Sequence, residues 1–211
     1  METLDCIESR RSIRKFLDIP VEFEKIGNIL NAGRLAPSAG NVQDWKFVLV
    51  TEADLRKQLA EACMQQYWME KAPVHIVVCS QPVKSERMYG KSGQELYSIQ
   101  NASAAAQNML LAAHDQGLGS CWIGAFQEAM VRRTLSMSED ARPLAIIPIG
   151  YPDEEPQVPN KLTVDNVTYI ERWGNRIKDF AAYLGYYSQH VAHAAIAGRE
   201  AMQKFIDKWS K

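Results

Sequence analysis

The sequence predicts a single domain in which helices pack around a buried β-sheet. Apolar residues recur at helical spacing in several segments, and short, nearly continuous apolar runs lie between them. No low-complexity stretch divides the 211 residues, so one sizeable core is expected. The hydrophobic fraction of 46% beside a charged fraction of 23% is that of an ordinary globular protein and argues against disorder.

Helices are expected before the C-terminal region over residues 4–8, 23–36, 52–62, 93–116 and 128–135. The second ends before Pro37, because the residue before a proline is pushed out of the helical region. The helix over 93–116 keeps one apolar face and carries many alanines, so another helix or a cofactor ring can approach it closely. Gly117 is typical of the residue that follows the last turn of a helix.

Strands are expected over residues 46–50, 74–79, 121–123 and 144–150, each a short apolar run. The polar stretch 80–91 is expected to be a loop, long enough for a mobile lid. Beyond residue 174, an apolar stripe with alternating spacings of about three and four predicts helix. We therefore expect a main domain over 1–174 and a helical extension over 175–211 that packs on a partner or over the site.

Composition limits the partners of the chain. Its 24 Lys and Arg balance 25 Asp and Glu, and a net charge of -1 predicts no general attraction to nucleic acid or to an anionic membrane. No apolar run approaches the length of roughly 20 residues that a membrane span needs. The cysteines (Cys6, Cys63, Cys79, Cys121) form no CxxC pair, and no secretory segment opens the chain, so a cytoplasmic location is expected.

An arginine cluster follows the first helix. Arg10, Arg11 and Arg14 lie within five positions of one another, with Ser12 between them. Guanidinium groups offer paired donors that match phosphate oxygens, and a hydroxyl adds another donor. The segment therefore suits a phosphate, although a basic surface turn explains it equally well.

Two further segments combine small and amide side chains beside a strand. In the first, Ser38, Asn41 and Gln43 suit the ribityl hydroxyls or the amide edge of a flavin, while an Asx turn is the simpler alternative. In the second, Gly124 and Ala125 let the backbone approach a flat ring, where an N–H could bond a flavin N5. A plain turn explains that second segment as well.

Taken together and in this order, these segments resemble the nitroreductase family of FMN enzymes, over about residues 4–172. The resemblance rests on Arg-Arg-Ser-Ile-Arg, Ala-Pro-Ser-Ala-Gly-Asn-Val-Gln-Asp-Trp, the helix Gln100 to Ala113, Gly-Leu-Gly-Ser-Cys-Trp-Ile-Gly-Ala-Phe and Ile-Pro-Ile-Gly-Tyr-Pro. Two positions depart from the family pattern. Asp44 stands where the family usually has proline, and Asn101 stands where it often has an acidic residue.

The resemblance implies an α+β fold with a mainly antiparallel central sheet flanked by helices. It also implies an intertwined homodimer with a swapped last strand and two FMN sites at the interface. The residues implied to bind FMN fall into three groups. They are Arg10, Arg11, Ser12 and Arg172 at the phosphate with Arg14 near N1 and O2; Pro37, Ser38, Ala39, Asn41 and Gln43 from the other subunit; and Trp122, Ile123, Gly124 and Ala125 near N5.

The implied activity is reduction of a small planar acceptor, such as a nitroaromatic or quinone, by NADH or NADPH. Hydride would pass through flavin N5 in a ping-pong cycle that needs no acid or base side chain. A protein that binds or senses flavin with little turnover is the alternative. The aromatic residues that could stack on an acceptor are Tyr67, Trp68, Tyr89 and Tyr97. No metal site is expected, because His190 and His193 have no nearby third ligand.

Overall fold

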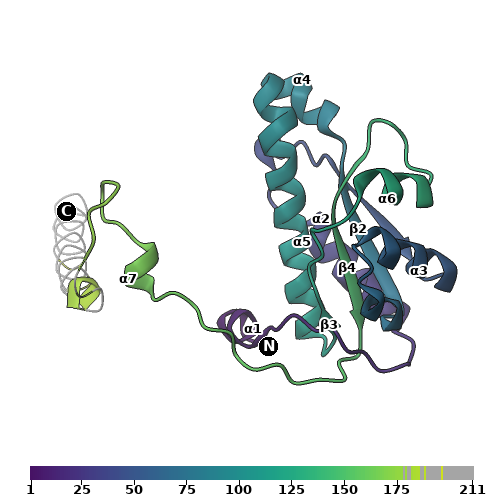
Figure 1. Ribbon diagram of the computed structural model, residues 1–211. Coiled ribbons are helices and arrows are strands. Elements are labelled where there is room, and N and C mark those ends of the chain that lie inside the picture. Colours follow the sequence, from purple (N-terminus) through teal and green to yellow (C-terminus); the bar gives the residue numbers. More distant parts are fainter. Residues whose placement is uncertain (178, 180–181, 186–187, 189–195, 197–211) are drawn as a thin grey trace, which may run out of the picture. The chain divides into compact units, whose positions relative to one another are not determined.

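The computed structural model describes residues 1–177, 179, 182–185, 188 and 196, and forms two compact units, Met1–Val158 and Pro159–Lys211 (Figure 1). The first unit is built on a four-stranded antiparallel sheet in the order β1-β2-β4-β3. Its strands are β1 Trp45–Val50, β2 Val74–Ser80, β3 Gly119–Ser120 and β4 Arg142–Gly150. The predicted α+β class with a mainly antiparallel sheet is confirmed.

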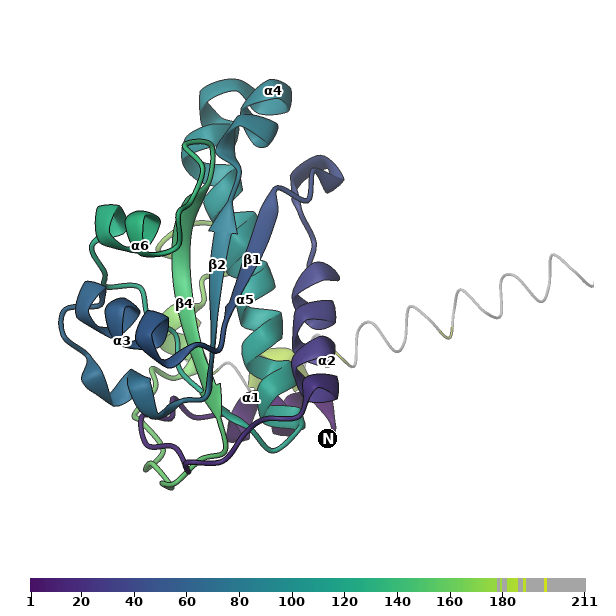
Figure 2. The same ribbon diagram turned by 90° about the vertical axis from the view of Figure 1, so that its right-hand side faces the viewer.

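Helices cover both faces of this sheet (Figure 2). Along the chain they are α1 Thr3–Ser9, α2 Phe23–Arg34, the 3-10 turn η1 Ala39–Asn41, α3 Ala53–Ala62, the 3-10 turn η2 Tyr67–Lys71, α4 Pro82–Ser92, the π-helix η3 Gly93–Tyr97, α5 Ser98–Asp115 and α6 Glu128–Thr134. Helices α2 and α5 pack on one face of the sheet, and α3 and α6 pack on the other.

The two faces of β2 explain why its sequence is mostly apolar. Ile76 and Val78 belong to the core under α2 and α5, whereas Val77 and Cys79 belong to the core under α3 and α6. All seven residues of the strand are buried. A strand covered on both sides is mostly apolar, and the two polar residues of this one, His75 and Ser80, are buried as well. The expected strand here is confirmed.

The strand expected at 121–123 is displaced, and a proline explains the difference. The antiparallel register pairs Gly119 with Gly150, and an isolated bridge further on pairs Ile123 with Ile146. The same register sets the intervening residues opposite Pro148, which has no N–H to donate. The ladder is therefore interrupted, and β3 keeps only its first two residues.

The expected loop over 80–91 is wrong, because most of this stretch forms α4. Pro82 occupies the first turn of the helix, where its missing N–H costs nothing. Gly90 adopts φ 58° and ψ −144° and reverses the chain. A Cβ at Gly93 would lie 2.2 Å from the carbonyl oxygen of Ser85, so a glycine is needed for η3 to fold back on α4. The segment is polar because much of this hairpin is exposed.

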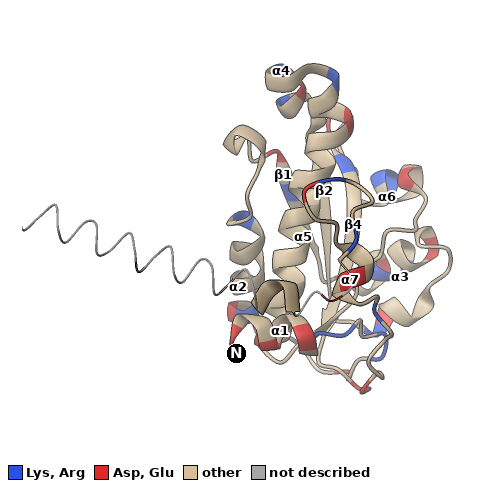
Figure 3. Cartoon of the chain, turned by 90° about the vertical axis from the view of Figure 1, so that its left-hand side faces the viewer, with Lys and Arg blue, Asp and Glu red and all other residues tan. Residues whose placement is uncertain are grey.

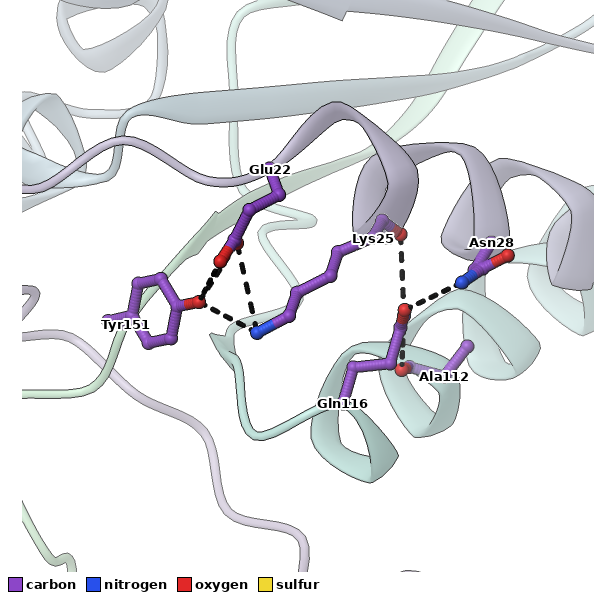
Figure 4. A network of polar contacts seen from close by, with 6 residues as sticks. All are labelled: Glu22, Lys25, Asn28, Ala112, Gln116 and Tyr151. Carbon is purple, nitrogen blue, oxygen red and sulfur yellow. Dashed lines mark hydrogen bonds and ion pairs between the residues drawn. The ribbon is translucent and has the colours of Figure 1, made fainter.

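A polar network joins α2 to α5 and to the end of β4 (Figure 4). The ammonium group of Lys25 donates to the hydroxyl of Tyr151 at 2.7 Å, and that hydroxyl donates to Glu22 at 2.9 Å. The side-chain amide of Asn28 donates to Gln116 at 3.0 Å. These contacts fix the point at which the chain leaves the sheet.

The second unit contains a short helix, α7 Val164–Val167, and a closed turn after it. The backbone N–H of Ile170 donates to the carbonyl of Asn175 at 2.9 Å, and the N–H of Asn175 donates to the carbonyl of Arg172 at 3.1 Å. Most of the predicted extension over 175–211, with His190 and His193, lies outside the described residues. No helix in the described part is long and apolar enough to cross a membrane.

Candidate functional site

The arginine cluster lies on an extended segment that is fastened to the β3 edge of the sheet. Ser12 forms a parallel bridge with Ser120, and the N–H of Ile13 donates to the carbonyl of Ser120 at 3.0 Å. Further along, the N–H of Leu17 donates to the carbonyl of Tyr151 at 2.9 Å. The segment therefore runs beside β3 and the end of β4 as an irregular edge strand.

Glycines on the sheet make room for this segment. A Cβ at Gly119 would lie 2.9 Å from three side-chain carbons of Ile13, and one at Gly150 would lie 3.1 Å from Phe16. Both apolar side chains are buried, at 7% and 6% exposure. Gly119 is thus explained by the close approach of the arginine segment, and Gly150 by that of the segment together with Pro73, whose Cδ would lie 2.7 Å from an added Cβ. Gly117 instead adopts φ 75° just after α5.

Burial of the apolar side chains leaves the cationic ones toward solvent. Arg10 and Arg11 are half-buried and Arg14 is exposed. A carboxylate oxygen of Glu154 accepts from the backbone N–H of Arg14 and from that of Lys15, the latter at 3.0 Å. Within the described chain no carboxylate pairs with any of the three guanidinium groups. Elsewhere, cationic and acidic positions are interspersed along helices such as α4 and α6 (Figure 3), so the cluster is a local feature.

Hydroxyl and thiol groups accompany the arginines on the sheet side. The hydroxyl of Ser120 is buried and has no hydrogen-bond partner within the described chain. Burial raises the pKa of the Cys121 thiol, and nearby Arg14, Ser12 and Arg10 partly oppose that shift. The three guanidinium groups form a donor set that fits a phosphate group.

The turn that follows β3 lies at the same edge of the sheet. Ile123 is buried and exchanges two backbone hydrogen bonds of 2.9 Å with Ile146, whereas Trp122, Gly124 and Ala125 are exposed. A Cβ at Gly124 would meet nothing nearer than the indole nitrogen of Trp122, at 3.4 Å. The backbone of this turn is open to solvent, and its approach by a flat ring stays a prediction.

The amide-rich segment lies at the opposite edge of the sheet, where it leads into β1. The N–H of Gln43 donates to the hydroxyl of Ser38 at 3.1 Å, and the Gln43 side chain donates to Asn41. Gly40, Asn41 and Gln43 all have φ between 51° and 57°, so the loop makes a tight left-handed turn. We call residues 38–43 the amide loop.

One chain does not bring the two predicted halves of the site together. The order β1-β2-β4-β3 puts three strand spacings, roughly 14 Å, between the edge that carries the amide loop and the edge that carries the arginines. Pro37, Ser38, Ala39, Asn41 and Gln43 thus lie apart from Arg10 to Arg14 and from Gly124. Arg172 is exposed in the second unit, and its approach to the arginine cluster stays a prediction.

The aromatic residues also divide between the two edges. Tyr89 and Tyr97 meet edge to face at 5.2 Å, and the Tyr89 hydroxyl packs against Gly40 of the amide loop. Trp68 instead stacks on Phe16 at 6.5 Å, behind the arginine segment. The tyrosine pair is therefore free to stack on an acceptor, whereas Trp68 packs against Phe16.

Several site residues were missed by sequence reasoning. Glu154, which holds the arginine segment by its backbone, and Ser120 carry no signal in their spacing. Asp44 and Asn101 depart from the family pattern, but nothing in the sequence indicates that their side chains form a hydrogen bond. No group of three or more metal-ligating side chains occurs among the residues that the structure describes.

Comparisons with known proteins agree with this geometry. The model of the Nitroreductase family matches residues 7–68 and 63–151. A protein of Methanothermobacter thermautotrophicus, named provisionally as an NADH dehydrogenase or NAD(P)H nitroreductase, is 34% identical over 177 residues, which cover 82% of this chain and 88% of that protein. The NADPH-flavin oxidoreductase of Vibrio harveyi is 28% identical over 217 residues, covering 99% and 88%.

The fold is shared with solved structures as well. The NADPH:FMN oxidoreductase from Vibrio harveyi, in complex with NAD+, matches with a TM-score of 0.75 at 26% identity, over 94% of this chain and 91% of that one. The family match covers well over half of the 211 residues and spans both the arginine segment and the turn at Gly124. The chain therefore belongs to the nitroreductase family.

Proposed function

We propose that the protein is an FMN-dependent oxidoreductase that uses NADH or NADPH to reduce a small planar acceptor, such as a nitroaromatic or a quinone. The observation that carries this proposal is the arginine segment held beside the open turn at Gly124. A phosphate on the arginines leaves a flat ring within reach of that turn. Relatives named NADPH-flavin oxidoreductase and FMN reductase support the choice of cofactor.

The phosphate of FMN is assigned to Arg10 and Ser12, with Arg11 and Arg172 contributing. The exposed side of the segment presents Arg10, Arg11 and Ser12, and its apolar side is buried in the core. Arg172 sits in a turn closed by two backbone hydrogen bonds, which leaves its side chain exposed. A preformed set of donors binds an anion without the entropy cost of collecting them.

The complete site requires a second copy of the chain. The amide loop and the arginines occupy opposite edges of one sheet, so the loop is assigned to the partner's FMN site. The edge strand β1 has a cavity of about 540 Å³ beside it, lined by Leu30, Asn31, Arg34, Gln43, Trp45, Lys46 and Phe47. An open edge with such a cavity suits an added strand from a homodimer partner. Exposed apolar residues of the second unit (Leu162, Val164, Val167, Trp173) also suit burial against another subunit.

When bound, FMN supplies hydride transfer through its N5 atom. The backbone of Gly124 and Ala125 is assigned to the N5 side of the ring, where an N–H can donate. The guanidinium of Arg14 is assigned to the N1 and O2 edge, where a fixed positive charge favours the anionic reduced ring. No side chain has to move a proton in this scheme. The nicotinamide and the acceptor use the same pocket in turn, and Tyr89 with Tyr97 offers a surface for stacking.

We assign the protein to a reducing cytoplasm. All four cysteines are free and buried. Burial raises the pKa of Cys63 and of Cys79 to about 12, which keeps both as unreactive thiols.

The test is the visible spectrum of the purified protein, followed by identification of the cofactor that it releases. We expect a yellow protein that releases FMN and oxidises NADH or NADPH steadily when a quinone is added. A yellow protein without turnover would indicate a flavin-binding or sensing role. A colourless protein that ignores added FMN would refute the proposal.

A further inference from the structure

A buried carboxylate lies directly beneath the amide loop. Asp44 is fully buried, as is Ser85 of α4, and Asn101 of α5 is only 3% exposed. The hydroxyl of Ser85 donates to one carboxylate oxygen of Asp44 at 2.6 Å, and the side-chain amide of Asn101 donates to the other at 2.9 Å. No Lys or Arg side chain pairs with this carboxylate in the described structure.

The network continues from Asp44 into the amide loop. The side-chain oxygen of Asn101 accepts from the backbone N–H of Ala39 at 2.9 Å. The side-chain amide of Asn101 therefore donates through its nitrogen to Asp44 and accepts through its oxygen from Ala39. Because only the nitrogen can donate to the carboxylate, the orientation of the amide is fixed. Ala39 opens the η1 turn, so this hydrogen bond sets the start of the left-handed turn at Gly40 and Asn41.

Helix α4 is tied to the same loop at a second point. The backbone N–H of Gln81, just before α4, donates to the carbonyl of Asp44 at 2.7 Å. At the other end of the helix, a Cβ on Gly40 would lie 2.2 Å from the hydroxyl oxygen of Tyr89. Helix α4 thus contacts this region at both of its ends, at Asp44 through Gln81 and at Gly40 through Tyr89.

We propose that Asp44 is a positioning residue for cofactor binding, acting through Asn101 and Ala39 on the shape of the amide loop. The proposal rests on the proposed function, in which this loop contacts the flavin of the partner subunit. Asp44 and Asn101 are the two positions that depart from the family pattern, and the structure shows that they are hydrogen-bond partners. The acidic group stands at position 44, and the side-chain amide at position 101 donates to it.

The decisive variant is Asn101→Asp. It places a second carboxyl group against Asp44, where an amide donor stands in the native protein. Two carboxylates at that distance repel unless one of them takes up a proton, so FMN binding is measured above neutral pH. We expect the apoprotein to bind FMN about tenfold more weakly, which corresponds to about 1.4 kcal/mol. The backbone amide of Ala39 is expected to exchange hydrogen faster, because its acceptor is displaced.

The double variant Asp44→Asn/Asn101→Asp exchanges donor and acceptor between the two positions. The amide at position 44 then donates to the carboxylate at 101, which still accepts from Ala39, and Ser85 still has an acceptor. We expect FMN affinity within about twofold of the wild type and recovery of Ala39 protection. Asp54→Asn, an exposed carboxylate in the first turn of α3, is the matched control and is expected to leave both measurements unchanged.

The measurements are the FMN dissociation constant from fluorescence titration of the apoprotein, hydrogen exchange at Ala39, and the unfolding temperature of the apoprotein. Native affinity in Asn101→Asp, or no recovery in the double variant, overturns the inference. If Asn101→Asp does not fold, Ser85→Ala replaces it: about threefold weaker FMN binding is expected from the loss of one hydrogen bond, and no change overturns the inference. Failure of the wild type to bind FMN refutes the proposed function itself, whereas FMN binding that is insensitive to these variants refutes only the role of Asp44.

Discussion

The contact between Gly119 and Ile13 gives a sharp test of how the arginine segment is held. In Gly119→Ala, the added methyl group would lie 2.9 Å from the Cβ, Cγ1 and Cγ2 atoms of Ile13. Two of these atoms branch from a Cβ that is itself in contact, so rotation of the side chain cannot relieve the overlap. The segment has to move away from β3, and the hydrogen bond from Ile13 to Ser120 lengthens.

The cost follows from overpacking in a filled core, which is about 2 kcal/mol. For a chain of this length, that loss lowers the unfolding temperature by about 4–8 °C. Because the arginines move with the segment, FMN binding is expected to weaken by about tenfold, or about 1.4 kcal/mol. Differential scanning calorimetry of the apoprotein and fluorescence titration with FMN measure the two effects separately.

Gly27→Ala is the matched control for this variant. Gly27 lies in the middle of α2, is exposed, and has nothing within 4 Å of an added Cβ. Alanine in a helix interior is expected to raise stability by about 0.5–1 kcal/mol without changing FMN affinity. If Gly119→Ala were as stable as the wild type and bound FMN equally well, the close approach of the segment to β3 would not be what positions the arginines.

Three further outcomes are expected. Arg14→Ala should lower the two-electron potential of bound flavin by about 30 mV, a tenfold change in the equilibrium constant; an unchanged potential in a spectroelectrochemical titration refutes the role assigned to Arg14. Gly124→Ala should have the unfolding temperature of the wild type, since the added Cβ has room, but its bound FMN should be reduced more slowly by NADH in stopped-flow measurements. A wild-type rate of reduction would show that the flavin ring does not lie against this turn. Burial lowers the pKa of His75 to about 4 from 6.5, so the unfolded chain binds a proton between these values and the native protein does not. The free energy of unfolding should therefore fall by up to about 3 kcal/mol as the pH drops from 6.5 to 4, and His75→Gln, measured by urea denaturation, should flatten this slope; an equal slope in both proteins contradicts the burial of a neutral imidazole.

Sequence reasoning predicted the elements whose pattern reflects burial. Strand β2 is mostly apolar because both of its faces are covered, and α5 keeps a small-residue face because α2 packs closely on it. A Cβ at Gly33 of α2 would lie 2.3 Å from Met109 of α5. Such patterns are local consequences of packing and can be read from spacing alone.

Other features depend on contacts between distant residues and left no local signal. Helix α4 was expected to be a loop because its sequence is polar, yet Gly93 lets the following turn pack on its backbone and bury Ser85. The break in β3 depends on Pro148, which lies almost thirty residues further along the chain in the facing strand. The hydrogen bond between Asp44 and Asn101 joins residues 57 positions apart, so neither position predicts the other.

The two half-sites lie at the edges of the sheet, on either side of its central strands. The buried strands β2 and β4 lie in the middle of the sheet and contribute to the core on both of its faces, while the arginine segment and the amide loop are attached to its edges. In the proposed homodimer, a two-fold axis that brings the β1 edge of one subunit to the β3 edge of the other does the same for the second pair of edges. One contact surface then completes two FMN sites. Under these proposals, each site would depend on the amide loop of the other subunit, whose shape would depend in turn on the buried hydrogen bonds of Asp44.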